Sequence, residues 1–332
     1  MMHILPGSPG FLAAMALAGI MGFAIQRGAT CTVAAVHEIV EKRRPRRLLA
    51  MVEASVWVGG GLALAASLQL PGSMPAGYPV TGFTVLGGIL LGLGAFVNRA
   101  CVFGAIARLG SGQWAYALTP PGFYAGCLTV DTVFQAPQFQ TLPYGSLVLR
   151  SPHWLALAFA AFALWRLAKA LRALRDESRQ SGLPTMLARR VWSPHAATMI
   201  IGISFLFMLL LAGAWAYTDV LTDLARSMMA ASLAARGLLL AALLLGAILG
   251  GWTAGLIRST RVTAAGLLSC FAGGMLMGWG SLLIPGGNDG LVLVGMPLLW
   301  PYAWLAFTTM CIAIGLAMLA QKAFAHPAGR RA

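Results

Sequence analysis

The sequence predicts an all-α polytopic membrane protein with about nine transmembrane helices, some of them broken or re-entrant. Only 10% of its 332 residues are charged, whereas soluble domains carry about a quarter. Its apolar runs continue for roughly twenty residues, the length at which a helix crosses a bilayer. A transmembrane barrel would instead show alternating segments of about ten residues. Membrane-spanning helices therefore explain this composition better than a soluble fold or a barrel.

Nine apolar runs are long enough to form spans. We expect helices at 9–27, 48–69, 82–98, 113–132, 153–171, 197–217, 236–257, 262–283 and 298–321. No Lys or Arg precedes the first run, although secretory signal peptides begin with a basic segment. We therefore expect the first run to be a span of the mature protein.

The basic residues predict the orientation. The formal net charge is +14, and the basic clusters follow the first, fifth, seventh and ninth spans, while 70–81 carries no charge. Loops rich in Lys and Arg stay in the cytoplasm. An N-terminus outside and a C-terminus in the cytoplasm place every basic cluster inside, so we expect a multi-pass protein of the bacterial inner membrane. Basic residues in short loops between spans argue against nucleic acid as a partner.

The richest basic segment divides the chain into halves. We expect an N-terminal transmembrane half at 1–165, a basic cytoplasmic connector at 166–196 and a C-terminal transmembrane half at 197–332. The connector's charged face would lie on anionic lipid or form a solvated loop, and both interpretations stay open.

An internal repeat is visible at a constant offset of 186 residues between 87–106 and 273–292. Five glycines of each stretch coincide, beginning with Gly-Gly at 87–88 and 273–274. The third predicted span runs inward and the eighth outward, so the repeat is expected to be inverted, as in many secondary transporters. A weaker match joins 27–35 to 258–265, but the spans next to those stretches run in the same direction.

Polar residues interrupt both copies of the repeat directly after the glycines. Asn98 and Arg99 follow in the first copy, and Pro285 with Asn288 and Asp289 in the second. Irregular backbone at membrane depth is tolerated only where it is buried in protein or lines a watery cavity. Corresponding breaks in two halves therefore point to a substrate site.

The five cysteines form no CxxC pair, so neither a structural metal site nor a cofactor is expected. Cys101 follows Arg99 by two residues, and Cys31 follows Arg27 by four. A guanidinium offers positive charge to an anion and lowers the pKa of a nearby thiol. An Arg at the cytoplasmic end of a span also serves as an anchor, and the spacing alone does not decide between these roles.

The stretch GGILLGLGAFVNRACVFGAIARLGSGQWAYA at 87–117 resembles the signature of the YeeE/YedE family, with Arg108 opening its Arg-x-Gly-x-Gly tail. The segment after the first span, with Cys31, is also similar. The resemblance implies uptake of a small sulfur-containing anion such as thiosulfate, passed between pore-lining thiols at Cys31 and Cys101 that donate weak hydrogen bonds. It also implies a cytoplasmic sulfur-carrier protein as a companion.

The second half departs from that family's pattern. Full transporters show a Gly-Cys there, whereas this chain has Gly287 at the offset from Cys101. Asn288 and Asp289 are candidates to bind the substrate instead, although an Asp repels a dianion unless it is paired or protonated. Alternatively, the segment is a tight outer turn. Both interpretations stay open.

The favoured function is that of a permease and not of an enzyme, since no nucleotide-binding or hydrolase motif is present. The alternatives are a membrane thiol or persulfide carrier in sulfur metabolism and a structural subunit of a larger complex. The predicted substrate-binding residues are Cys31, Cys101, Arg99, Arg108, Asn98, Gly94, Gly104, Gly287, Asn288 and Asp289.

Overall fold

The computed structural model describes residues 7–70, 74–135, 140–150, 153–181, 191–226, 230–257 and 260–325, and within these ranges it contains helices and no strands. The helices up to the centre of the chain are α1 (Pro9–Gly28), α2 (Thr32–Lys42), α3 (Arg46–Ser67), α4 (Gly82–Val97), α5 (Val102–Gly110), the 3-10 helix η1 (Trp114–Leu118), α6 (Thr119–Phe134) and α7 (His153–Ser181). Those that follow are α9 (Pro194–Ala212), α10 (Tyr217–Ala225), α11 (Ala230–Thr253), α12 (Ala264–Leu283), α13 (Asn288–Gly290), the π-helix η2 (Leu291–Gly295) and α14 (Pro301–Ala325).

Eight helical segments of the described chain are long and apolar enough to cross a membrane. They agree with eight of the nine predicted spans. The remaining prediction, 113–132, corresponds to η1 followed by α6, whose 16 residues span only about 24 Å at 1.5 Å per residue. The all-α polytopic fold is therefore confirmed, with one helix shorter than expected.

The helices follow one another in the same order twice. In the first half, the order is long α1, short α2, long α3 and α4, short α5 and longer α6. In the second half, α9 to α14 repeat this order, with α10 and α13 as the short helices. Val102 and Asn288, which begin the second short segments, keep the offset of 186 residues seen in the sequence. The counterpart of α1 is thus α9, so the weak match between 27–35 and 258–265 is wrong: residues 260–263 lie between α11 and α12, and α11 is the counterpart of α3.

The packing of the helices shows how the halves are related. α1 packs on α9 and α4 packs on α12, so each of these helices contacts its own counterpart. The other contacts come in matching pairs, such as α3 with α9 and α11 with α1, or α6 with α12 and α14 with α4. Contacts of this reciprocal kind are those that a two-fold axis produces.

The glycine motif forms the crossing between α4 and α12. A Cβ atom on Gly94 would lie 2.7 Å from the carbonyl oxygen of Gly273, and one on Gly87 would lie 2.7 Å from that of Gly280. Gly87 corresponds to Gly273 and Gly94 to Gly280, so the two contacts are equivalent and the helices run antiparallel. The repeat is therefore inverted, and Gly94 serves helix packing.

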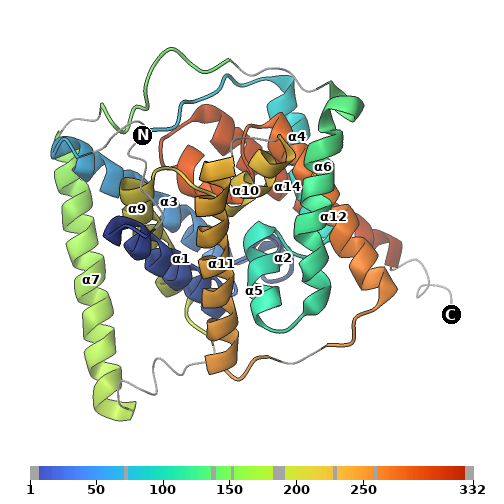
Figure 1. The fold of residues 1–332 in the computed structure, drawn as a ribbon. Coiled ribbons are helices and arrows are strands. Elements are labelled where there is room, and N and C mark those ends of the chain that lie inside the picture. The colour runs from blue at the N-terminus through green and yellow to red at the C-terminus, as the bar shows by residue number, and fades with distance from the viewer. Residues whose placement is uncertain are drawn as a thin grey trace.

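Helix α7 belongs to neither set of helices and packs on α3 of the first set. Figure 1 shows it at the edge of the molecule, on the side opposite α6 and α12. Its Arg166 forms an ion pair with Glu53 of α3, which also contacts Nδ1 of His195 on α9 at 2.5 Å. The predicted boundary at 165 falls within this continuous helix, and 182–190 of the predicted connector lie outside the described residues.

The closeness of the α4–α12 crossing gives a stability prediction. In Gly273→Ala the new methyl group would lie 2.6 Å from the backbone nitrogen of Asn98, so the helices must separate at a cost of about 1–3 kcal/mol. Gly237→Ala on α11, where no atom lies within 4 Å of the added carbon, is the matched control. A lower apparent melting temperature of the purified Gly273→Ala protein alone is expected, and equal values for the two variants would contradict the tight crossing.

Candidate functional site

Four short helical segments begin inside the molecule rather than at its ends. Their N-terminal boundary residues are Cys31 for α2, Cys101 for α5, Ala216 for α10 and Gly287 for α13. All four have extended backbone, and none of their side chains caps its own helix. The first amide groups of a helix lack partners within it and carry partial positive charge. Such ends, when buried, attract anionic or hydrogen-bond-accepting groups.

The sequence creates these starts by ending the preceding helices sharply. Ala29 follows helix α1 and Arg99 lies two residues after helix α4, both in the left-handed region with φ of 45° and 57°. Helix α12 ends before Pro285 and Gly286. Each break is followed within two residues by a new helix start, so the chain turns back inside the protein as the sequence predicted.

The first half contributes a pair of thiols. Cys101 is fully buried and Cys31 is 8% exposed, and the two thiols are close neighbours. The backbone amide of Thr32, the first residue of α2, donates to Cys101 Sγ at 3.1 Å. Gly104 leaves room for the Cys31 side chain, because a Cβ atom there would lie 2.5 Å from Cys31 Sγ.

The second half contributes a carboxylate and an amide. Asn288 is fully buried and Asp289 is 2% exposed, so this segment is not a solvent-exposed turn. Both carboxylate oxygens of Asp289 accept hydrogen bonds from Thr218 on α10, one from its backbone amide at 3.1 Å and one from its hydroxyl at 2.6 Å. Gly287 allows this approach, since a Cβ atom on it would lie 2.8 Å from Asp289 Oδ1.

One hydrogen bond joins the two halves of the site. Thr32 Oγ1 donates to Asn288 Oδ1 at 3.3 Å. The amide nitrogen of Asn288 has no partner among the described residues, although it is buried. A buried donor without a partner costs about 1–3 kcal/mol, so this N–H is an unused donor close to the thiols.

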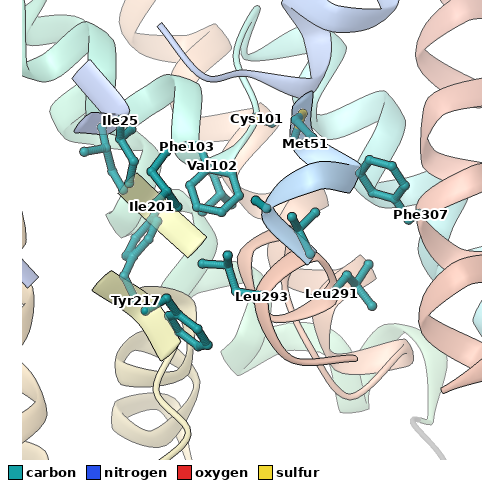
Figure 2. Close-up of a cluster of buried hydrophobic side chains, with 14 of the residues drawn as sticks. Ile25, Met51, Cys101, Val102, Phe103, Ile201, Tyr217, Leu291, Leu293 and Phe307 are labelled. Atoms are coloured by element: carbon teal, nitrogen blue, oxygen red, sulfur yellow. The ribbon is translucent and has the colours of Figure 1, made fainter. Parts of the chain in front are cut away.

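Apolar side chains surround the polar groups. Figure 2 shows Val102 and Phe103 of α5 in one cluster with Ile201, Tyr217 and Leu293, close to Cys101. All of them are buried. Because few polar atoms compete in such surroundings, each hydrogen bond made to a bound solute is stronger than in water.

Four predicted residues lie outside this cluster, among them Gly94 in the helix crossing. Arg99 is exposed. Arg108 donates to the hydroxyl of Tyr116 at 2.8 Å and its guanidinium lies over that ring. Asn98 donates to the carbonyl of Ala100 at 2.8 Å and accepts from Thr119 at 3.0 Å, so it shapes the loop that presents Cys101. The structure thus brings together Cys31, Cys101, Gly104, Gly287, Asn288 and Asp289, and leaves Arg99, Arg108, Asn98 and Gly94 outside the cluster.

Sequence reasoning missed the two threonines that bind these groups. Thr32 directly follows Cys31, and Thr218 lies at the start of the matching helix α10. The signal is a threonine within the first two residues of α2 and of α10, two segments that the match between 27–35 and 258–265 does not pair. The π-helix η2 was also missed; Ser55 of α3 donates to its Val292 carbonyl at 2.6 Å.

A cavity of about 900 Å³ opens on one face of the molecule. Its wall includes Asp219, Thr222 and Arg226 from α10 and the segment after it, and Cys127 from α6. It reaches Pro285 and Gly286, the residues directly before Gly287. The cavity therefore leads from the surface to the second-half part of the cluster.

The chain is similar to a known protein family. A family model described as sulphur transport matches residues 27–316, which include both thiols and the second-half cluster. No curated protein matches the chain.

The contact between Gly104 and Cys31 gives a second prediction. Gly104→Ala should displace the Cys31 side chain and lower the stability by about 1–3 kcal/mol, the usual cost of overpacking. The control is its repeat counterpart, Gly290→Ala, where the nearest atom to the new carbon is Ala216 Cβ at 3.9 Å. Thermal unfolding of both purified variants measures the difference, and a Gly104→Ala protein as stable as the control would show that the site is looser than described.

Proposed function

Because the chain belongs to the sulphur transport family, we propose that it is a permease that moves a small sulfur-containing anion, such as thiosulfate, across the bacterial inner membrane. The family and the eight candidate spans support a transport role in a membrane.

The observation that carries this proposal is the meeting of short-helix N-termini with two thiols in a buried cluster. The dipoles of α2, α5 and α10 place partial positive charge there without a basic side chain. The S–H groups of Cys31 and Cys101 and the unused N–H of Asn288 are weak donors for the oxygens and sulfur of the anion. Weak, successive contacts suit transport, since a site must release what it binds.

The cavity is the proposed entrance from outside. With the N-terminus outside, the ends of α6 and α12 that line it face away from the cytoplasm. Exposed Arg226 offers positive charge at its wall, beside Asp131 and Asp219. The anion would pass Gly286 and Gly287 before it reaches the thiols.

The cluster is closed in this conformation. Cys101 has no exposed surface, and the Thr32–Asn288 hydrogen bond spans the gap between the halves. Transport then requires that this bond open while the glycine crossing of α4 and α12 holds the halves together. On the cytoplasmic side, a sulfur-carrier protein is the proposed acceptor of the anion.

The burial of both thiols argues against the alternative of a persulfide carrier. Such a carrier must present its sulfur to a partner protein, and reactive cysteines are usually at least partly exposed. Here the thiols are reached only by a solute small enough to enter the helix cluster. A transported anion meets that condition.

Removal of the fully buried thiol tests the function. Cys101→Ala should abolish thiosulfate uptake, because the anion loses a donor and Thr32 loses its acceptor. Cys311→Ala on α14 is the control, since Cys311 lies outside the cluster. Growth of a strain that lacks thiosulfate import, with thiosulfate as sole sulfur source, measures the outcome. Normal growth with Cys101→Ala at matched expression would refute the thiol role, and failure of the unmodified chain on thiosulfate but rescue on sulfite would change the substrate.

A further inference from the structure

We propose that the carboxyl group of Asp289 takes up a proton when the anion binds, so that this chain couples anion uptake to the inward movement of one proton. The inference rests on the proposed function and adds its driving ion.

In the described part of the chain, the carboxyl group of Asp289 is buried without a positively charged partner. The side chain is 2% exposed, and its two oxygens accept from the amide and hydroxyl of Thr218. Among the described residues, no Lys or Arg forms an ion pair with it, and Arg236, which lies near Asp219, pairs with Asp223. Ionisable residues inside membrane proteins are costly and mark ion or proton pathways.

In each half of the site, a backbone amide at the start of a short helix donates a hydrogen bond to a buried acidic group. At the start of α2, the amide of Thr32 donates to Cys101 Sγ; at the start of α10, the amide of Thr218 donates to Asp289 Oδ2. Asp289 thus stands in the second half where the first half has a thiol, beside the Gly287 that corresponds to Cys101. The carboxyl group takes the structural place of a second-half cysteine.

Only a protonated carboxyl group can donate a hydrogen bond to an anion as a thiol does. A thiol is neutral and has a hydrogen to donate, whereas an ionised carboxylate only accepts hydrogen bonds. An anion next to an ionised Asp289 meets like charge, and like charges at short distance favour protonation of the carboxylate. Binding of the anion and of a proton are therefore mutually favourable.

The described groups that face Asp289 from neighbouring elements carry no positive charge that would neutralise an ionised Asp289. Helix α10 contributes Tyr217 and Asp219, a neutral hydroxyl and an acid, and α5 packs on the same segment without a Lys or Arg between Val102 and Ala107. Asp219 accepts from the Ala216 amide at 3.0 Å and also lines the cavity. It is placed to pass a proton between cavity water and Asp289.

Coupling also has an electrical advantage. A dianion that enters a cell moves two negative charges toward an interior at negative potential, which opposes entry. A proton that moves with it reduces the transferred charge to one. The proton gradient then contributes to uptake in addition to the anion gradient.

Accumulation in proteoliposomes tests the inference. The purified full-length chain is reconstituted with the membrane potential clamped at zero, and radiolabelled thiosulfate is added with the outside one pH unit more acidic. One coupled proton gives about a tenfold higher concentration inside at equilibrium, since a factor of ten corresponds to one pH unit. Asp289→Asn should equilibrate thiosulfate without accumulation, while Asp289→Glu and the surface control Glu41→Gln should still accumulate it.

Each outcome decides the question. If Asp289→Asn accumulates as much thiosulfate as the unmodified chain, the proton role of Asp289 is overturned. The same holds if the unmodified chain transports thiosulfate but does not accumulate it. Should Asp289→Asn be inactive, a pH dye trapped inside vesicles of the unmodified chain must report acidification when thiosulfate is added, and its absence overturns the coupling. No transport by the unmodified chain under any gradient would instead reject the proposed function.

Discussion

Where α4 crosses α12, the two backbones lie so close that only hydrogen fits at Gly87, Gly94, Gly273 and Gly280. Both helices end a few residues beyond this crossing, so the breaks that follow are held inside protein and away from lipid. The hydrocarbon core supplies no water for open backbone groups, so irregular chain persists there only when protein encloses it. The packing of glycine backbones is therefore the condition under which Cys101 and Gly287 can start new helices in the interior.

The sequence predicted most of the membrane topology because span length and charge distribution are local signals. It also located the crossing, since glycines at a close helix contact cannot be replaced. The correspondence of α1 with α9 was missed, because both helices pack through apolar side chains, and many different apolar residues meet that need without a shared pattern. Cys31 matches Ala216 by position in the fold, which no comparison of these two residue types reveals.

The site was predicted in part for a similar reason. The cysteines and the Asn-Asp pair stood out as polar residues at helix breaks, and they lie within one cluster. The arginines stood out equally, yet Arg108 packs on Tyr116 and Arg99 is exposed. Charge along the sequence does not show which way a side chain points at a helix end. The threonines were missed because their role comes from contacts with residues far away in the chain.

Helix α7 contributes no residue to the cluster, yet it determines how the two halves face each other. The four longer helices of each half, α6 included, return the chain to the side of the membrane from which it entered. Two such halves joined directly would have the same orientation in the membrane. They would then be related by a translation or by a rotation axis along the membrane normal. One extra crossing turns the second half over, so α3 and α11 approach the centre from opposite faces. A helix at the edge, which packs on α3 through Phe159 and Phe162 and pairs with Glu53, thereby gives the two halves their opposite orientations.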